Sequence, residues 1–111
     1  MKMLELNKEN FDVEVLQTSQ TVFVDFYGDG CEPCKALMPF VHSMSEKYEK
    51  GLKFAALNTT QARRLAISQR VLGLPVMAIY KNGEKVAELI KDDCTEANIE
   101  KMIKDYMDEK W

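Results

Sequence analysis

The chain has 111 residues, of which 46% are hydrophobic and 30% charged, so it is long enough for one domain with a buried core and too short for two. Its formal net charge is −3 and its isoelectric point is about 5.2, which argues against nucleic acid as a partner. No apolar run reaches the roughly 20 residues of a membrane-spanning helix, and no apolar signal-peptide core follows the N-terminus. We therefore expect a cytoplasmic protein.

The first half of the chain alternates between strand and helix patterns. Residues 3–6 predict a short edge strand, and residues 7–17 predict a helix with Asn7 as its N-cap. Residues 21–27 are apolar at nearly every position and rich in β-branched side chains, which is typical of a strand buried on both faces. From residue 31 to about 50 the apolar residues recur at helical spacing, so a long amphipathic helix follows.

The second half continues the alternation and then changes direction. Residues 52–58 predict a strand, and residues 61–73 predict a helix that stops at Gly73. Residues 76–90 contain two strand patterns joined by an Asn-Gly pair at 82–83, the dipeptide that tight hairpin turns prefer. This segment therefore predicts an antiparallel hairpin.

The last predicted element is an amphipathic helix over residues 95–107, with Thr95 as its N-cap. The resulting order, β-α-β-α-β-α-β-β-α, predicts an α/β fold. We expect a central mixed, mostly parallel sheet of about five strands, flanked by about four helices, in a single domain over residues 1–111. The closing hairpin supplies the antiparallel edge.

Cys31 and Cys34 follow directly after the strand at 21–27, with Glu32 and Pro33 between them. Sheets of this kind do their chemistry at the carboxyl ends of the strands. Four interpretations remain open: a redox couple, half of a metal site, a structural disulfide, or two buried thiols. At the start of a helix, the backbone dipoles favour a thiolate at Cys31. Cys34 lies one turn further on, where its sulfur can meet that of Cys31.

Asp25 is the second unusual residue, because it lies inside the apolar run "FVDFY". A buried carboxyl group without a partner is costly, and burial raises its pKa. Such a group could carry a proton for a neighbouring thiol. The alternative is a strand register that turns Asp25 toward solvent, but its apolar neighbours favour burial.

The stretches "VDFYGDGCEPCK" and "GLPVMAIYKNGE", together with the order of the elements, resemble the thioredoxin family over nearly the whole chain. A CxxC pair alone would also fit a zinc site. The resemblance is specific because the pair lies at a strand-to-helix turn, with Pro39 in the same helix and a G-x-P sequence before the hairpin. It implies the thioredoxin fold and a thiol–disulfide oxidoreductase that reduces protein disulfides.

The resemblance also implies a role for each site residue. Cys31 corresponds to the attacking thiolate, and Cys34 to the resolving thiol that forms the redox-active disulfide with it. Asp25 corresponds to a buried acid–base group. Pro75 corresponds to a cis-proline that faces the disulfide and, with Val76, contacts an extended substrate. The implied substrate-binding surface also includes Gly30, Glu32 and Pro33.

Cofactors and partners follow from the same resemblance. It implies no bound cofactor or metal, and electrons from a partner thioredoxin reductase that is NADPH- and flavin-dependent or ferredoxin-linked. The other partners would be disulfide-containing proteins, with no nucleic acid and no membrane, and we expect a monomer.

With Gly30 directly before Cys31, the sequence is most similar to the atypical thioredoxins of anaerobic bacteria. Some of these serve amino-acid reductases such as glycine reductase. A dedicated electron donor to such a system is therefore an alternative function. A disulfide isomerase and a redox-inert adaptor are further alternatives. The buried Asp25 argues against the isomerase, and the intact CxxC pair argues against the adaptor.

Several positions depart from the usual family pattern. Gly30 and Tyr27 stand where tryptophans are usual, and Ala56 stands where a lysine usually pairs with the buried aspartate. Val76 replaces the commoner threonine, and Lys91 aligns near a small glycine-containing loop. These departures predict an altered docking surface around the cysteine pair.

The remaining chemically active residues are predicted to be structural. A zinc site would need ligands beyond the CxxC pair, and only Cys94, His42 and carboxylates remain. We expect His42 on the helix surface, Cys94 as a small buried hydrophobe and Trp111 frayed at the chain end.

Overall fold

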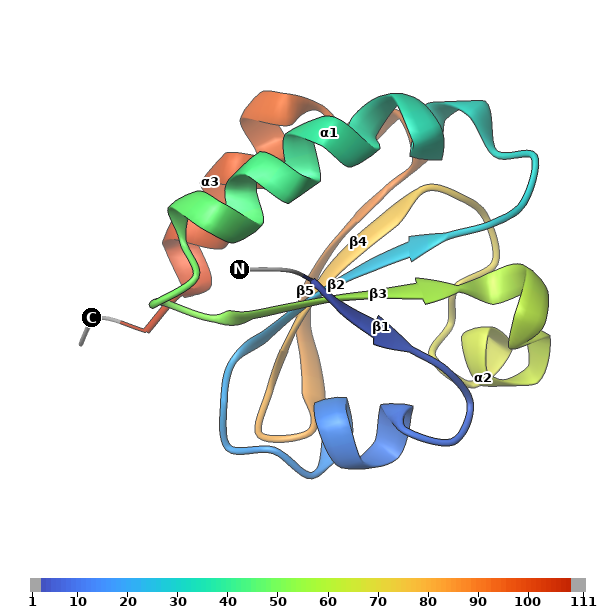
Figure 1. Ribbon diagram of the computed structural model, residues 1–111, viewed down its shortest axis with the longest axis horizontal. Helices are drawn as coiled ribbons and strands as arrows, with labels where there is room; N and C mark the ends of the chain where they lie inside the picture. The colour runs from blue at the N-terminus through green and yellow to red at the C-terminus, as the bar shows by residue number, and fades with distance from the viewer. Residues whose placement is uncertain (1–2, 109–111) are drawn as a thin grey trace.

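The computed structural model describes residues 3–108 and contains a five-stranded sheet in the order β1-β3-β2-β4-β5 (Figure 1). Strand β2 (Val22–Tyr27) lies at the centre, parallel to β3 (Lys53–Asn58) and antiparallel to β4 (Val76–Lys81). The short β1 (Leu4–Leu6) runs parallel to β3 at one edge, and β5 (Glu84–Ile90) runs antiparallel to β4 at the other. The predicted fold class is confirmed. The antiparallel part begins one strand earlier than expected, at the β2–β4 pairing.

Four helices cover the two faces of the sheet (Figure 1). Helices α1 (Glu32–Lys47) and α3 (Glu96–Tyr106) lie on one face. The turn of π-helix η1 (Asp12–Leu16) and helix α2 (Arg63–Ser68) lie on the other. The short 3₁₀ turns are η2 (Thr59–Gln61) and η3 (Lys91–Asp93).

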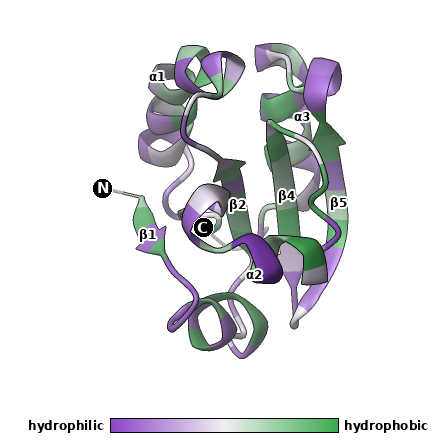
Figure 2. Ribbon diagram, turned by 90° about the vertical axis from the view of Figure 1, so that its right-hand side faces the viewer, coloured by the Kyte–Doolittle hydropathy of each residue, from purple (hydrophilic) through white to green (hydrophobic). Residues whose placement is uncertain are grey.

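Strand β2 separates two hydrophobic cores, because successive side chains of a strand point to opposite faces. Val22, Val24 and Phe26 pack on the side of η1 and α2, whereas Phe23 packs with the residues of α1 and α3. The neighbouring strand β4 is largely hydrophobic as well (Figure 2). Burial on both faces explains the nearly continuous apolar sequence of these strands. Asp25 lies on the same face of β2 as Phe23, and it is a charged residue buried among hydrophobic ones.

The helix predicted over residues 7–17 is only partly correct. Asn7 does act as a cap, since its side-chain oxygen accepts hydrogen bonds from the N–H groups of Glu9 and Asn10, both at 2.8 Å. The N–H of Phe11 also bonds to the carbonyl oxygen of Asn7, four residues back, at 3.1 Å, so a helical turn does begin at Asn7. The regular part begins later and is wider than an α-helix, because the N–H of Gln17 bonds to the carbonyl oxygen of Asp12, five residues back, at 2.9 Å.

The helix predicted over residues 61–73 is wrong at both ends, because α2 spans only Arg63–Ser68. It ends where Arg70 adopts a left-handed backbone with φ 62°. The N–H of Arg70 then bonds to the carbonyl of Ile67, and that of Val71 to the carbonyl of Ala66, both at 2.9 Å. This is the Schellman arrangement, with arginine at the position that glycine usually occupies. Gly73 therefore does not end the helix.

The predicted hairpin and C-terminal helix are confirmed. Asn82 and Gly83 have φ values of 52° and 81°, as a two-residue turn of type I′ requires. Thr95 caps α3 by accepting a hydrogen bond from the N–H of Asn98 at 3.1 Å. The prediction for Trp111 lies outside the described residues.

Gly83 is expected to tolerate no side chain. A Cβ atom there would lie 2.6 Å from the carbonyl oxygen of Leu16, and its φ of 81° already disfavours other residues. We expect Gly83→Ala to lower the free energy of unfolding by about 3 kcal/mol, measured by urea denaturation of the oxidised protein. Gly30→Ala is the matched control: its φ is 76°, but no atom lies within 4 Å of the added Cβ. It should cost only about 1 kcal/mol, and equal losses would contradict the role of the Leu16 contact.

Candidate active site

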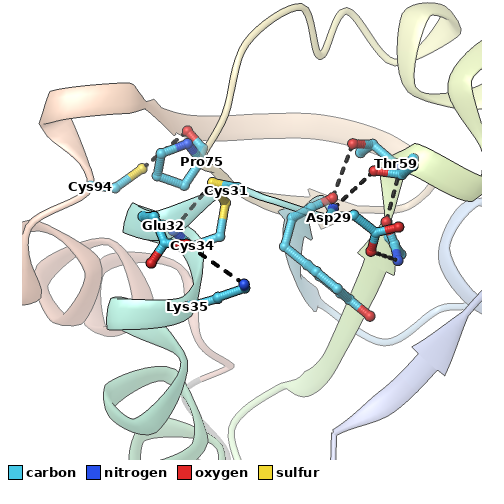
Figure 3. The surroundings of a disulfide bond; sticks show 11 residues. Asp29, Cys31, Glu32, Cys34, Lys35, Thr59, Pro75 and Cys94 are labelled. Atoms are coloured by element: carbon cyan, nitrogen blue, oxygen red, sulfur yellow. Dashed lines mark hydrogen bonds and ion pairs between the residues drawn. A yellow bond between two sulfur atoms is a disulfide. The ribbon is translucent and has the colours of Figure 1, made fainter.

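Cys31 and Cys34 form a disulfide at the start of α1, where the chain leaves the carboxyl end of β2 (Figure 3). The sulfur atoms are 2.09 Å apart and the Cα atoms 5.3 Å apart. Cys31 is the N-cap of the helix, and its sulfur accepts the N–H of Cys34 at 3.2 Å. Pro33 lies in the first turn, where no intrahelical N–H is needed. The helix start thus brings both sulfur atoms to the end of the sheet.

The two cysteines differ in exposure. Cys31 is half-buried, whereas only 2% of the surface of Cys34 is exposed. Glu32 and Pro33 are both exposed beside Cys31. A disulfide partner from outside can therefore approach the sulfur of Cys31 more easily than that of Cys34.

The turn before the disulfide is tied to the end of β3. Gly30 has a left-handed φ of 76°, which lets the chain turn tightly from the strand into the helix. The N–H of Asp29 donates to the hydroxyl of Thr60 at 2.9 Å, and its carboxylate accepts from the Asn58 side chain at 3.1 Å. Thr59 donates to the carbonyl of Tyr27 at 3.0 Å. These bonds hold the loop that carries the disulfide (Figure 3).

Asp25 is buried, as predicted, with 1% of its surface exposed. Among residues 3–108, neither carboxyl oxygen has a hydrogen-bond partner. Its neighbours across the sheet are Ala56 on β3 and Met77 on β4, so neither paired position offers a cation. The pKa of Asp25 rises to about 7, first because burial disfavours the charged form and second because of the negative charge of Glu5.

Glu5 contributes to the raised pKa of Asp25, and this was not predicted from the sequence. The register pairs Glu5 with Ala56 and Ala56 with Asp25, so both carboxyl groups lie in one row on the same face of the sheet. Tyr27 donates a hydrogen bond from its hydroxyl to Glu5 at 2.8 Å, which fixes this carboxylate at the sheet edge. The position of Glu5 depends on the register of β1 against β3, and β1 is too short for that register to be predicted from the sequence.

A surface hollow of about 290 Å³ reaches the buried side of the disulfide. Its lining consists of Tyr27, Gly28, Asp29, Cys34, Lys35 and Met38. Tyr27 lies on the same face of β2 as Asp25, because Asp25 precedes it by two residues and side chains alternate along a strand. The hollow therefore borders Cys34 on the side of the sheet where the buried carboxyl group lies.

Pro75 arrives at the site from the start of β4. The bond between Leu74 and Pro75 is cis, as the family resemblance implied. Val76 pairs with Phe26 near the end of β2, which places Pro75 beside the loop that carries the cysteines. Figure 3 draws Pro75 among the surroundings of the disulfide. The fold thus brings the cysteine pair and Pro75 to one end of the sheet, and Asp25 lies two residues before the end of β2.

Cys94 is buried, as predicted, with 6% of its surface exposed. Its sulfur lies 3.5 Å from the carbonyl oxygen of Pro75 and 3.3 Å from that of Leu89. Burial, as the largest cause, raises the pKa of this thiol to about 11, so it stays protonated at neutral pH. His42 is exposed on α1, also as predicted. Within residues 3–108 no three His, Cys, Asp or Glu side chains are grouped to hold a metal ion.

Comparisons with known proteins agree with this geometry. The thioredoxin family model matches residues 2–105. A thioredoxin of Acetoanaerobium sticklandii is 54% identical over 105 residues, covering 95% of this chain and 100% of the relative. A thioredoxin of Peptoclostridium acidaminophilum is 52% identical over 101 residues, covering 91% and 92%. Thioredoxin C-2 of Corynebacterium nephridii is 32% identical over 82 residues, covering 74% and 76%.

None of the helices between residues 3 and 108 has the length and apolar character needed to cross a membrane. The matches cover nearly the whole chain, and the two most similar of these relatives come from bacteria related to the anaerobic Clostridia. Together with the disulfide at the end of β2, they identify the chain as a member of the thioredoxin family and a thiol–disulfide oxidoreductase.

Proposed function

We propose that this protein reduces disulfides of other proteins, with Cys31 as the attacking thiolate and Cys34 as the resolving thiol. The observation that carries the assignment is the difference in exposure, since Cys31 is half-buried and Cys34 is 2% exposed. The position of Cys31 at the helix N-terminus adds to it, because the dipole there favours an anion.

The reaction proceeds in two exchanges. The thiolate of Cys31 attacks one sulfur of the substrate disulfide, forming a mixed disulfide and releasing the other substrate sulfur as a thiolate that takes up a proton. The deprotonated thiol of Cys34 then attacks Cys31, forms the Cys31–Cys34 disulfide and releases the second substrate thiol. The substrate gains two electrons and the protein loses two.

Asp25 is the proposed acid–base group for the second exchange. Its pKa of about 7 leaves both the neutral and the charged forms populated at neutral pH, so it can take a proton and later return it. It shares the face of the sheet on which the hollow beside Cys34 opens. Solvent in that hollow is the proposed carrier of the proton between the thiol and the carboxyl group.

An extended substrate segment is proposed to lie along Leu74, Pro75 and Val76. No backbone hydrogen bond within residues 3–108 uses the N–H or C=O of Leu74. These groups are therefore open to a substrate strand, which main-chain hydrogen bonds would align beside Cys31. Gly30, Glu32 and Pro33 would border the same segment.

A partner reductase is proposed to restore the dithiol, with electrons from NADPH through a flavin or from ferredoxin. The protein would act in the cytoplasm, where thiols are kept reduced. The likeness to thioredoxins over nearly the full chain supports this assignment.

Cys34→Ser is expected to trap substrates as mixed disulfides with Cys31, because the resolving sulfur is absent. The trapping reaction uses the pre-reduced variant without dithiothreitol, which would cleave the mixed disulfide. In a separate assay with dithiothreitol as electron source, its reduction of a model disulfide protein should fall toward the uncatalysed rate. Non-reducing electrophoresis and mass spectrometry of the linked peptides measure the trapped species. Cys31→Ser is the matched control and should be equally inactive without trapping. Accumulation of mixed disulfides in Cys31→Ser instead would reverse the two roles.

A further inference from the structure

Lys91 adopts a backbone conformation that suits glycine, with φ 53°. It follows β5 and begins the short turn η3. Two hydrogen bonds hold it there: its N–H donates to the carbonyl of Pro75 at 2.8 Å, and its carbonyl accepts from the N–H of Cys94 at 3.0 Å. A left-handed conformation destabilises any residue with a Cβ atom, and such outliers gather at functional sites. Lys91 therefore places a cationic side chain near Pro75 in a backbone conformation that disfavours any side chain.

The side chain of Lys91 lies across Gly73, two residues before Pro75. A Cβ atom on residue 73 would collide with Cε of Lys91 and would lie 3.2 Å from its Nζ atom. The absence of a side chain at Gly73 therefore provides the seat for the lysine stem. A stem that is already packed loses less conformational freedom when its amine binds a partner.

The charge of Lys91 is available to a partner. Its side chain is exposed, and it takes part in none of the ion pairs within residues 3–108. Gly73 and Leu74 also border a surface hollow of about 370 Å³ whose rim carries Arg63, which is likewise outside those ion pairs. Lys91 and Arg63 thus lie on the Pro75 side of the site, where Asp92 and Asp93 follow Lys91 in the same turn.

Two acidic residues also border the disulfide. Asp29 and Glu32 are exposed on the loop and the first turn of α1, and Glu32 is only weakly compensated by Lys35 at 3.7 Å. The rim of the site therefore carries charges of both signs, because the exposed Asp92 and Asp93 follow Lys91 in η3. Lys91 is the cation whose stem lies over Gly73, next to the Leu74–Pro75 segment along which a substrate would lie.

We propose that Lys91 is a specificity residue that favours disulfides whose cysteine is flanked by aspartate or glutamate. This inference rests on the proposed function, because it concerns the same substrate segment. Attraction between Lys91 and a carboxylate beside the substrate cysteine would hold the extended segment in register with Cys31. Exposed charge pairs of this kind change rate or equilibrium constants by about two- to fivefold.

The test uses the reduced protein in single-turnover reactions, so that no reductase takes part. The probes are two peptide disulfides, each carrying a fluorophore and a quencher on its two halves. One peptide has aspartate on both sides of the cysteine and the other has asparagine. Stopped-flow fluorescence gives a second-order rate constant for each, and the measured quantity is the ratio of the aspartate rate to the asparagine rate.

Lys91→Met keeps an aliphatic stem and removes the charge, so the ratio is expected to fall about threefold. In the wild-type protein, 0.5 M salt should lower the ratio toward the value of the variant, since screening weakens the attraction. Lys104→Met removes the same charge from the last turn of α3, whereas Lys91 lies before the first turn of that helix. This control variant should leave the ratio unchanged. A ratio that is the same in Lys91→Met and wild type would overturn the proposal.

Lys91→Gly separates the charge from the backbone conformation. It should lower the ratio as far as Lys91→Met does, yet raise the thermal midpoint by about 4 °C, because glycine tolerates the left-handed φ. A lower midpoint in this variant would contradict the argument from backbone strain. If the wild-type protein reduces neither peptide, the proposed function itself fails. If it reduces both peptides and the ratio is the same in wild type and in the Lys91 variants, only the specificity proposal fails.

Discussion

Asp25→Asn is expected to stabilise the oxidised protein by about 4 kcal/mol at pH 8 and by little at pH 4. The pKa of Asp25 in the folded protein is about 7, compared with an ordinary value of 3.8. Each unit of difference corresponds to about 1.36 kcal/mol, so keeping this carboxylate ionised in the fold costs about 4 kcal/mol. Asparagine is close in shape and never ionises.

The direction of the pH dependence follows from the proton count. Between about pH 4 and pH 7 the folded protein holds a proton on Asp25 that the unfolded chain has lost. The contribution of Asp25 to stability therefore falls as the pH rises through this window, and stays constant above it. In Asp25→Asn that fall is absent, so the difference between the two proteins isolates the effect from all other carboxyl groups.

Urea denaturation at pH 4, 6 and 8 measures this difference. Asp29→Asn is the matched control, because Asp29 is exposed and should change stability little at any of these pH values. Glu5→Gln should shift the window for Asp25 to lower pH, since the charge of Glu5 is the second cause of its raised pKa. A constant difference between Asp25→Asn and wild type from pH 4 to 8 would contradict a raised pKa.

The cost of Asp25 is also informative about function. A buried carboxyl group with no hydrogen-bond partner in the described part of the chain lowers stability. A hydrophobic residue in its place would make the protein more stable. Strongly perturbed titratable groups gather at active sites. The replacement by Ala56 of the lysine that is usual in the family leaves this cost uncompensated, and Glu5 adds to it.

The strands and the candidate site could be predicted because local sequence decides them. The apolar runs of β2 and β4 follow from burial on both faces, and the Asn82-Gly83 turn follows from its left-handed residues. The cysteine pair lies within one strand–turn–helix unit. Its position at the end of the sheet therefore needed no knowledge of long-range contacts.

Features that depend on tertiary contacts could not be predicted. One local feature was missed as well: helix α2 ends at Ser68, and the Schellman turn that follows places Arg70, instead of a glycine, in the left-handed conformation. The influence of Glu5 on Asp25 depends on the register of β1 across β3, which a three-residue strand does not reveal. The contact of Lys91 with Gly73 joins residues 18 positions apart through the shape of two loops.

A generic NADPH-dependent thioredoxin reductase is expected to turn over this protein with a kcat/KM at least about tenfold below that of an ordinary thioredoxin. Gly30 is exposed, and a Cβ added there would have no atom within 4 Å, so this part of the surface lacks the aromatic side chain that the family usually presents. Loss of one aromatic anchor at an interface can cost about 2 kcal/mol or more, and 1.4 kcal/mol already corresponds to tenfold.

Two charged features add to this loss. Asp29 and Glu32 are exposed beside Cys31, and the stem of Lys91 covers Gly73, two residues before Pro75. A reductase shaped for a neutral, aromatic surface would meet these acidic groups and an unmatched lysine. We therefore expect a dedicated reductase whose docking face places basic groups against Asp29 and Glu32.

Steady-state NADPH oxidation over a range of protein concentrations measures the difference, with an ordinary thioredoxin in parallel. Gly30→Trp is expected to recover only part of the tenfold loss. It restores the aromatic contact, but its φ of 76° disfavours any side chain by about 1 kcal/mol and would shift the loop that carries Cys31. Equal kcat/KM values for the two wild-type proteins would mean that Gly30, Glu32 and Lys91 do not affect docking. In that case a generic reductase would suffice to maintain the Cys31–Cys34 pair in its reduced form.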